Sequence, residues 1–476
     1  MEYTVKKVHL GPAHFALDLS DGSERGEYVN QDYILRTLGR PHRNINLMYT
    51  YYPHDKEWPA RISKAYADKE VNFAWDYPYD DYFPYDKKTG NPNPIECMKD
   101  VRRHGQDVTL TLTIDCSLSD EELREVARDL RPFGRMRVRI NHECVGDWFT
   151  HNKRFSFKEI AEFFARFTDI IHEEAPNVKT IFCAGFSEED GAPVDKEEDL
   201  IAGYRAADVW SGDRYLALHF GWPYDIAEKD DNGRHCYYKL DEVYNKFRYT
   251  YERLKKITGQ DKPVVMSELN ADGDVTGALH QGDAIKRFLY MIRDDKPTWF
   301  TAATMYQFRD RGRLGLEIED PNNPAVGIPQ PLLKDYKEVM SEPYFMPELK
   351  VEEDQEFPVR LRWGGAEDSD GVSIQLHFES NPEFCELVFE QDLSLMMELN
   401  GTWFYKAPGV KCVDLMSAFY EKPLSCSADL SLNIFATPPE GVNVDDGSED
   451  WAVNYYATIT KLPDIRIRFE PVSVIE

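Results

Sequence analysis

The sequence predicts an α/β protein with a (β/α)8 barrel, also called a TIM barrel, and a C-terminal all-β sandwich. From about residue 43 to residue 340, short apolar segments alternate with amphipathic segments, which is the pattern of repeated βα units. After Met340 the helical periodicity ends and short strand-like segments follow one another, as in a β-sandwich. The chain has 476 residues, which is long enough for two such domains.

Eight segments of the first region have the length and apolar content of barrel strands. They are Asn44–Tyr49, Val71–Asp76, Val108–Ile114, Met136–Asn141, Thr180–Ala184, Tyr215–His219, Pro263–Ser267 and Thr301–Tyr306. A doubly wound open sheet is the alternative, and it usually carries a glycine-rich turn after its first strand. The stretch Tyr49-Thr50-Tyr51-Tyr52-Pro53 contains no glycine. The closed barrel is therefore favoured, with its active site at the C-terminal ends of the strands.

Helix signals lie between these strands. The clearest helix follows the fourth predicted strand and has an apolar face made of Phe157, Ile160, Phe163, Phe164, Phe167, Ile170 and Ile171. Ser156 with Glu159 forms a capping box at its start, and Ser119 with Glu122 repeats this device earlier in the chain. The segment Asp241–Ile257, bounded by Gly259, predicts the helix before the seventh strand.

We divide the chain at residues 42 and 340. Residues 1–42 contain a predicted hairpin turn at Asp18-Leu19-Ser20-Asp21-Gly22, and the N-terminal strands are candidates for joining the sandwich. Residues 43–340 form the barrel. The acidic run Glu352-Glu353-Asp354 marks a linker, and residues 341–476 form the sandwich. The sandwich strands are expected at Pro358–Trp363, Val372–Phe378, Leu430–Phe435, Trp451–Thr460 and Asp464–Phe469.

Charge and composition limit the partners. The net charge of −29 argues against nucleic acid and anionic membranes, which both need a positive surface. An aromatic content of 13% suits packed cores and also sugar-binding clefts, because the C–H faces of a pyranose are apolar. The N-terminus lacks the apolar region of a secretory signal, and the eight cysteines include no Cys-x-x-Cys pair. We expect a cytoplasmic protein with reduced thiols, or a secreted one whose signal peptide has been removed.

Two predicted strands each deliver a glutamate at the C-terminal end. Glu143 follows the fourth strand, and Glu268 follows the seventh. A pair of carboxyl groups at the mouth of a barrel is the apparatus of retaining glycoside hydrolysis, which needs them about 5–5.5 Å apart. In this interpretation Glu143 is the acid/base and Glu268 the nucleophile. Taken alone, either residue is equally consistent with an ordinary surface or salt-bridged glutamate.

The sequence segments around both glutamates resemble those of a known family. Arg139-Ile140-Asn141-His142-Glu143-Cys144-Val145-Gly146-Asp147-Trp148-Phe149 is similar to the His-Glu-Met-Asn-Gly-x-Trp acid/base segment of glycoside hydrolase family 26, the β-mannanase family. Val265-Met266-Ser267-Glu268-Leu269 is similar to its Thr-Glu-Phe-Gly nucleophile segment. In clan A, to which this family belongs, the acid/base follows strand four and the nucleophile strand seven. Cys144-Val145 and Leu269-Asn270 depart from the family pattern, so the resemblance favours the clan more than the family.

Further residues fit a sugar-binding role by their position near predicted strand ends. The candidate substrate ligands are His142, Asn141, Trp148, His219, Trp222, Tyr224, Trp75, Asp76, Tyr306 and Arg309. Arg137 and Arg139 alternate on the fourth predicted strand, so both are expected to point into the barrel and to keep Glu268 ionised. Arg309 opens a basic run that suits an acidic or decorated polysaccharide. Salt bridges with Asp310 and Glu317 are the alternative for that run.

The sequence therefore predicts a retaining glycoside hydrolase acting on β-glycosidic bonds of a plant or algal polysaccharide or its oligosaccharides, with an endo-β-mannanase-like activity as one specific form. An exo-β-glycosidase, or an endo-enzyme on galactan, xylan or β-glucan, is a second interpretation. A carbohydrate-binding protein that kept the barrel and lost catalysis is a third. We expect no cofactor and no metal site, because the oxygen-rich stretch 317–323 lacks the ordered ligand spacing of a calcium loop.

Overall fold

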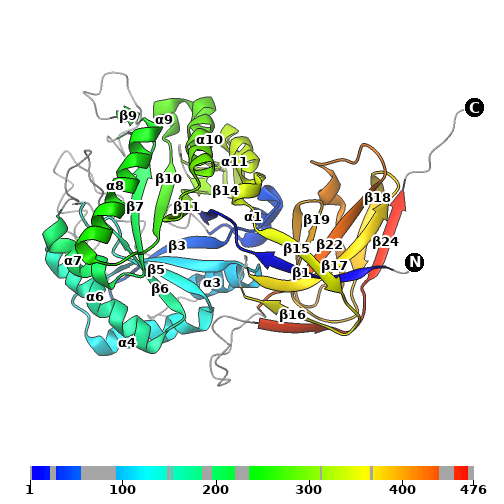
Figure 1. The fold of residues 1–476 in the computed structure, drawn as a ribbon, viewed down its shortest axis with the longest axis horizontal. Coiled ribbons are helices and arrows are strands. Elements are labelled where there is room, and N and C mark those ends of the chain that lie inside the picture. The colour runs from blue at the N-terminus through cyan, green and yellow to red at the C-terminus, as the bar shows by residue number, and fades with distance from the viewer. Residues whose placement is uncertain are drawn as a thin grey trace, which may run out of the picture.

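The computed structural model describes residues 3–21, 28–54, 93–146, 151, 154–184, 196–219, 235–237, 239–310, 314–364, 368–438 and 455–469. These residues form a helix-surrounded barrel and a β domain that lie side by side along the long axis of the molecule (Figure 1). The first and the last described strands, Val5–Gly11 and Asp464–Phe469, both belong to the β domain. The chain therefore starts in the β domain, builds the barrel and returns.

The barrel is a closed sheet of eight parallel strands, which confirms the predicted fold class. In chain order they are β2 (Ala16–Ser20), β3 (Asn44–Tyr51), β4 (Asp107–Ile114), β5 (Met136–Ile140), β6 (Val178–Cys183), β7 (Val209–Tyr215), β10 (Val264–Asn270) and β11 (Phe300–Met305). Each strand pairs with the next, and β11 closes the ring onto β2. The C-terminal ends of all eight strands thus meet at one mouth.

One of the predicted barrel strands is wrong, and one strand of the barrel was not predicted. The first strand is β2, although its Asp18-Leu19-Ser20 text predicted a hairpin turn outside the barrel. The sixth is β7, whereas Tyr215–His219 was predicted, and Ala217–His219 instead forms the short strand β8. The predicted strand Val71–Asp76 lies outside the described residues, and the ring closes without it. In chain order β5 is the fourth strand of the ring and β10 the seventh, so the glutamates keep their predicted association with strands four and seven.

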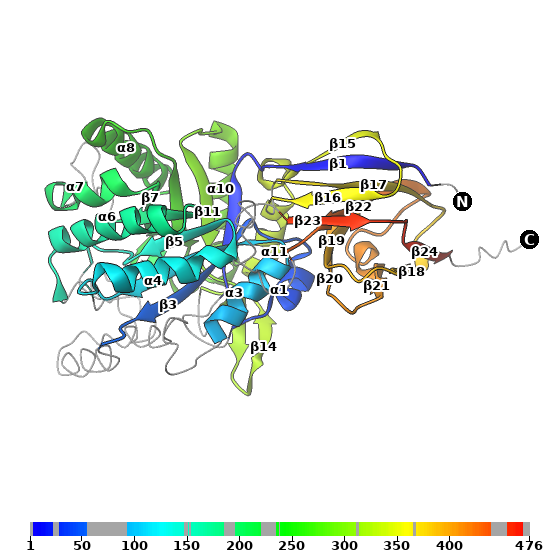
Figure 2. The ribbon, with the colours of Figure 1, turned by 90° about the horizontal axis from the view of Figure 1, so that it is seen from below.

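Helices cover the outside of the ring in both views (Figures 1 and 2). They are α1 (Gln31–Leu38), α3 (Asn93–Arg103), α4 (Asp120–Leu130), α6 (Phe157–Glu174), α7 (Glu197–Ala206), α8 (Leu240–Thr258), α9 (Gly273–Thr276), α10 (Ala278–Asp295) and α11 (Pro331–Met340), with 3-10 turns at Arg131–Phe133 and Pro343–Phe345. A further 3-10 turn, Met416–Phe419, belongs to the β domain. Capping boxes at Ser119 and Ser156 begin α4 and α6 as predicted. Gly259, at φ 72°, ends α8. None of the described helices is long and apolar enough to cross a membrane.

Short additional strands follow the C-terminal ends of β7 and β11 at the barrel mouth. β8 pairs with β9 (His235–Tyr237), and β12 (Arg309–Asp310), β13 (Glu317–Asp320) and β14 (Asn323–Pro329) form a small sheet after β11. The β14 hairpin projects away from the body of the molecule (Figure 2).

The β domain consists of two antiparallel sheets. The larger has the order β15-β1-β17-β22-β19-β20, with β16 pairing β17 and β23, and the smaller has the order β21-β18-β24. The strands are β1 (Val5–Gly11), β15 (Glu348–Asp354), β16 (Val359–Trp363), β17 (Ser369–Phe378), β18 (Pro382–Val388), β19 (Leu395–Leu399), β20 (Thr402–Lys406), β21 (Cys412–Asp414), β22 (Ala428–Ala436), β23 (Tyr455–Ile459) and β24 (Asp464–Phe469). Apolar side chains from both sheets, such as Ile374 of β17 and Leu387 of β18, share one core, as in a sandwich.

The acidic run Glu352-Glu353-Asp354 was predicted as a linker but belongs to β15, at the edge of the larger sheet. Its side chains are exposed, and β15 pairs antiparallel with β1. Charged residues on an edge strand discourage pairing with other chains, which explains why this strand looks like a polar linker in the sequence.

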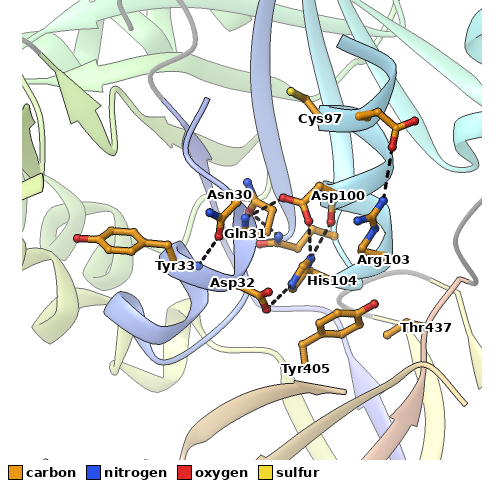
Figure 3. Close-up of polar contacts among 12 residues, drawn as sticks. Asn30, Gln31, Asp32, Tyr33, Cys97, Asp100, Arg103, His104, Tyr405 and Thr437 are labelled. Carbon is orange, nitrogen blue, oxygen red and sulfur yellow. Dashed lines mark hydrogen bonds and ion pairs between the residues drawn. The ribbon is translucent and has the colours of Figure 1, made fainter. Parts of the chain in front are cut away.

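The two domains meet where α1 and α3 contact β20 (Figure 3). His104 donates hydrogen bonds to Asp32 Oδ1 at 2.9 Å and to the carbonyl oxygen of Asp100 at 2.8 Å, and its ring centroid lies 4.1 Å from that of Tyr405 in β20. Gly105 follows with φ +73°, and a Cβ atom there would lie 2.6 Å from Trp363 of the β domain. Only glycine therefore allows this close approach.

The side chains that point into the barrel differ between its two halves. On β2 to β5 they are polar, and Ser20, Asn46, Thr111 and Arg139 form a hydrogen-bonded row across the four strands. A small apolar cluster, from β6, β7, β10 and β11 with the first residue of β2, consists of Ile181, Val209, Val265, Ala302 and Ala16. The main core lies between the strands and the helices. The polar row leads to the mouth of the barrel and ends at the candidate site.

Candidate active site

Three carboxyl groups converge at the mouth of the barrel. They belong to Glu143, which follows β5, Asp213 on β7 and Glu268 on β10. One oxygen atom from each lies within 4.8 Å of the other two. Residues that are far apart in the chain are thus brought together by the parallel ring, because the strand ends converge.

Glu268 is held by a hydrogen bond at each carboxylate oxygen. Arg139 donates from Nη2 to Oε1 at 2.7 Å, and the Tyr215 hydroxyl donates to Oε2 at 2.7 Å. The residue is only 5% exposed. Donors on both oxygens fix the direction in which the carboxylate points.

Arg139 is completely buried and serves two carboxylates. Its Nη1 donates to Asp213 Oδ2 at 2.8 Å, in addition to the bond to Glu268, and its Nε donates to Thr111 Oγ1 at 2.8 Å. Burial alone lowers the pKa of Arg139, but the charges of Asp213 and Glu268 outweigh it and hold the pKa well above its usual value. The guanidinium is therefore a permanent cation at the centre of the site.

Asp213 has a strongly raised pKa. Burial raises the pKa of Asp213 to about 7, and the neighbouring charge of Glu268 adds to this effect, while Arg139 acts against it. Its side chain is 2% exposed, and Oδ1 is buried with no hydrogen-bond partner among the described residues. A carboxyl group with a pKa near neutrality can hold or release a proton at working pH.

The segment that carries Glu143 has a constrained backbone. Asn141 and Glu143 have φ values of 45° and 51°, in the left-handed region that residues other than glycine seldom occupy. The Asn141 side chain accepts a hydrogen bond from the Ile114 amide at 2.8 Å and donates to the Ile114 carbonyl at 3.1 Å and to Cys116 Sγ at 3.3 Å. Asn141 thus ties the segment to the end of β4. Strained backbone of this kind clusters at functional sites, where it positions reactive groups.

His142 directly precedes Glu143 in the chain, and its side chain faces Glu268. Its Nε2 is 3.9 Å from Glu268 Oε1, and its side chain is 1% exposed. Burial, together with the charge of Arg139, lowers the pKa of His142 well below its usual value. The imidazole is therefore neutral and leaves Arg139 as the cation beside Glu268.

Aromatic rings form the wall on the β7 and β11 side. Tyr215 and Tyr306 pack edge to face with centroids 6.0 Å apart. The Tyr306 carbonyl accepts a hydrogen bond from the Asn270 side chain, and Met48 packs against Tyr306 in a small buried cluster. Tyr306 thus lies at the strand end where the sequence predicted it, next to a tyrosine that contacts Glu268.

No protein-family model and no curated protein matches this chain, but solved structures do. A modular endo-β-1,4-mannanase from Cellulomonas fimi matches with 12% identity over 93% of this chain and 93% of that one, at a TM-score of 0.41. A family 26 β-mannanase from Bacteroides ovatus matches with 13% identity over 70% of this chain and 90% of that one, at a TM-score of 0.41. An α-L-arabinofuranosidase from Thermotoga maritima matches with 11% identity over 91% and 100%, at a TM-score of 0.44.

The chain is thus similar in structure to barrel glycosidases, including mannanases of the family that its two motifs resemble. Identities and TM-scores this low carry no information about substrate or mechanism, which have to be argued from the site.

Several predicted site residues lie elsewhere than expected. Arg137 does not contact Glu268 but lies toward the opposite end of the barrel, where its Nη1 is 3.4 Å from Asp18. Two residues along a strand span about 7 Å, which separates Arg137 from the mouth that Arg139 reaches. Arg309 is buried and ion-paired with Glu317 at 3.1 Å, which is the salt-bridge alternative. His219 belongs to β8, opposite His235 of β9, and not to the sixth barrel strand.

The aromatic candidates Trp148, Trp222, Tyr224 and Trp75, together with Asp76, lie outside the described residues. Their predicted role in binding sugar therefore remains a prediction.

The sequence interpretation missed Asp213 and Tyr215. Both belong to β7, and they alternate with Ser211, so that all three point the same way along the strand. The signal was present in Val209-Trp210-Ser211-Gly212-Asp213-Arg214-Tyr215, where an apolar start is followed by polar residues at every second position. Because the sixth strand was predicted at Tyr215–His219, residues 209–214 were not assigned to a strand and this alternation was not recognised.

The three carboxyl groups also have the spacing of a metal-binding cluster. The site already contains its own cation, because Arg139 contacts Asp213 and Glu268 directly. We therefore interpret the cluster as an acid–base centre built around a guanidinium.

Proposed function

We propose that this protein is a retaining glycoside hydrolase that cleaves β-glycosidic bonds by double displacement. The observation that carries the proposal is the approach of a Glu143 and a Glu268 carboxyl oxygen to within 4.8 Å. Retaining enzymes hold their two carboxyl groups about 5–5.5 Å apart, whereas inverting enzymes hold them about 6.5–9.5 Å apart to admit a water molecule. The measured spacing suits direct attack by a carboxylate.

In the first step Glu268 attacks the anomeric carbon as the glycosidic bond breaks. Its negative charge passes into the new ester bond, while Glu143 gives its proton to the departing glycosidic oxygen. Arg139 and Tyr215, each 2.7 Å from one oxygen of Glu268, keep the carboxylate ionised and aimed before attack. Their hydrogen bonds also make it a better leaving group when the ester is later cleaved.

In the second step Glu143 takes a proton from water, and the resulting nucleophile displaces Glu268 from the anomeric carbon. The net configuration is retained because each step inverts it once. Asp213 is the third acid of the centre. With a pKa of about 7, it can release a proton when Glu268 loses its charge in the ester and take one up again when the carboxylate is regenerated, so the net charge around Arg139 stays nearly constant through the cycle.

The substrate class is a plant or algal polysaccharide or its oligosaccharides, and an endo-β-mannanase-like activity is the first form to test because both glutamate motifs resemble that family. An exo-β-glycosidase, or an endo-enzyme on galactan, xylan or β-glucan, is the alternative specificity. An acidic polysaccharide has less support, since Arg309 is ion-paired with Glu317. A non-catalytic carbohydrate-binding protein has less support because it needs no three-carboxyl centre around a buried cation.

The proposal is tested by screening polysaccharides and aryl β-glycosides and reading the first-formed product anomer by proton NMR. We expect the β-anomer from a β-linked substrate. Release of the α-anomer, or no hydrolysis of any substrate by the wild-type protein, would contradict the proposal.

The roles of the two glutamates are separated by azide. In Glu143→Ala, azide should accelerate turnover of an activated aryl glycoside and give a β-glycosyl azide, because the covalent intermediate on Glu268 still forms. In Glu268→Ala, azide attacks in place of the carboxylate and should give the α-glycosyl azide. The reverse pattern of products would exchange the two roles.

A further inference from the structure

The end of the barrel opposite the catalytic mouth contains an uneven set of buried charges. The arginines Arg43, Arg102, Arg135 and Arg137 gather there around two aspartates, Asp18 and Asp107. They lie at or near the N-terminal ends of β2 to β5, where Asn44 pairs with Asp107 and Arg137 with Thr109. Four guanidinium groups thus face two carboxylates, in a protein whose net charge is −29. We call this set the basal arginine cluster.

Asp107 satisfies two of these arginines well. Its Oδ1 accepts from Arg102 Nη1 at 2.7 Å and its Oδ2 from Arg135 Nε at 2.6 Å. These distances are typical of charge-assisted hydrogen bonds, which are about 2.7–2.9 Å long.

Asp18 makes longer contacts with the other two arginines, Arg43 and Arg137. Its Oδ2 lies 3.2 Å from Arg43 Nη2 and 3.4 Å from Arg137 Nη1, while its Oδ1 accepts from the backbone and side chain of Asn44. Among the described residues, this long contact is the one polar contact of the Arg137 side chain. The Nε of Arg43 is buried and has no hydrogen-bond partner there. Two guanidinium groups thus keep donors that no described residue satisfies.

The cluster is open toward solvent on its cationic side. Arg102, at 3%, is as buried as Asp18 and Asp107, whose side chains are 5% and 4% exposed. The side chains of Arg43, Arg137 and Arg135 are 14%, 22% and 38% exposed. Burial, and the nearby charge of Arg43, lower the pKa of Arg137 to about 10, so the guanidinium remains charged at neutral pH and its charge is poorly compensated. An anion arriving from solvent would meet the arginines first.

We propose that the basal arginine cluster binds one small tetrahedral oxyanion, of the phosphate or sulfate type, between Arg43 and Arg137. Guanidinium groups suit such oxyanions because their N–H donors form parallel hydrogen bonds to two oxygens. The bound anion neutralises the excess positive charge and joins β3 to β5 beneath the polar row that supports Arg139. The site is structural, and its location at the N-terminal face of the barrel agrees with the stabilising role of that face.

The test uses the full-length protein and inorganic phosphate, at constant ionic strength maintained with sodium chloride. Thermal unfolding should shift to higher temperature with increasing phosphate and then saturate, because a ligand that binds only the folded state stabilises it by mass action. Isothermal titration calorimetry should give one site per chain. A phosphate effect no larger than that of chloride would overturn the proposal.

Variants locate the site. Arg137→Met and Arg43→Met should each weaken phosphate binding by about tenfold or more, which corresponds to the loss of one charge-assisted contact. The matched control is Arg128→Met, which removes an exposed arginine of α4 that pairs with Glu174 and should leave phosphate binding unchanged. Unaltered binding in both basal variants would overturn the assignment.

Two further measurements keep the test decisive. If Arg137→Met and Arg43→Met fail to fold, Arg135→Met, at a more exposed position, should still weaken phosphate binding measurably. Glu268→Gln should bind phosphate as the wild type does, since the catalytic mouth lies at the other end of the barrel. A change in phosphate affinity in Glu268→Gln would place the anion at the mouth and contradict the basal site.

Discussion

Arg139 in the barrel and His104 at the domain junction are both buried cations that contact two carboxylates. Arg139 lies between Asp213 and Glu268, and His104 lies between Asp32 and Asp100 (Figure 3). The partners of Arg139 are 2% and 6% exposed, whereas those of His104 are 60% and 14% exposed. The same arrangement of charges is therefore found in two environments, which differ in how far water reaches the carboxylates.

The pKa values of the aspartates shift in opposite directions at the two places. At the junction, the hydrogen bond from His104 lowers the pKa of Asp32, and the interactions with both aspartates raise the pKa of His104 to about 9 in spite of its burial. In the barrel, burial raises the pKa of Asp213 to about 7. Where water solvates the acids, the group of charges is a stable ion cluster. Where water is excluded, ionisation of one acid is unfavourable and its pKa rises toward neutrality. That carboxyl group can then exchange a proton at working pH.

The largest expected effect comes from Glu268→Gln. The amide keeps the shape of the carboxylate and can still accept from Arg139, so the fold should be retained. It cannot act as a nucleophile, and kcat should fall by a factor on the order of 10⁴. Steady-state kinetics on an aryl β-glycoside, with circular dichroism as the control for folding, measures this. Activity within tenfold of the wild type would remove Glu268 from the mechanism.

Arg139→Met should have the largest effect on stability. Methionine fills part of the volume but leaves two buried carboxylates without their cation, which costs about 3–5 kcal/mol. Urea denaturation at neutral pH measures the loss. The double variant Arg139→Met/Asp213→Asn removes one of the orphaned charges and should recover part of it. If the single and double variants were equally stable, Arg139 would not be stabilising a negative charge on Asp213.

The junction should be sensitive to alkaline pH. Because the pKa of His104 is raised from 6.5 to about 9 in the folded protein, its contribution is fully present below about pH 6.5 and is lost as the pH rises through about 9. We expect a loss on the order of 2 kcal/mol, seen as a slope in the free energy of unfolding of the wild type that is absent in His104→Asn.

His377→Asn is the matched control for this slope, because His377 pairs with Asp429 on the surface, where both side chains are more than half exposed. It should behave as the wild type. An alkaline slope that persists unchanged in His104→Asn would assign the titration to another group.

Asp213→Asn should change the pH dependence of stability with a distinctive sign. The raised pKa of Asp213 means that its stabilising contribution is present below about pH 4 and is lost as the pH rises through about 7. The asparagine variant cannot charge, so its stability should gain on that of the wild type by about 2–3 kcal/mol between about pH 5 and about pH 8. In activity, the ionisation near pH 7 should disappear from the kcat/KM profile. A stability difference that is constant with pH would contradict the assigned pKa.

The glutamate pair was predictable because it depends on topology more than on detail. Glu143 and Glu268 follow apolar strand segments, and any closed parallel barrel brings such positions to one mouth. The capping boxes at Ser119 and Ser156 were predictable for a local reason, since each is complete within four consecutive residues.

Other features were hidden because barrel interiors are polar at this site. Asp18 and Ser20 of β2 point into the barrel, and in the sequence they look like a turn. Asp213 and Tyr215 of β7 look like the polar residues after a strand for the same reason. A strand with one polar face inside a barrel loses the continuous apolar run by which buried parallel strands are recognised.

By itself, the sequence determined the class of fold and the two residues at the heart of the proposed reaction, because strand order and helix caps are written in short local patterns. Only the tertiary structure decided that Arg139 and not Arg137 reaches Glu268, that Arg309 is paired with Glu317, and that Asp213 completes the centre. Those outcomes depend on how far each side chain lies along the barrel axis and on whether water reaches it. Burial and distance are properties of the packed ring, and no single strand contains them.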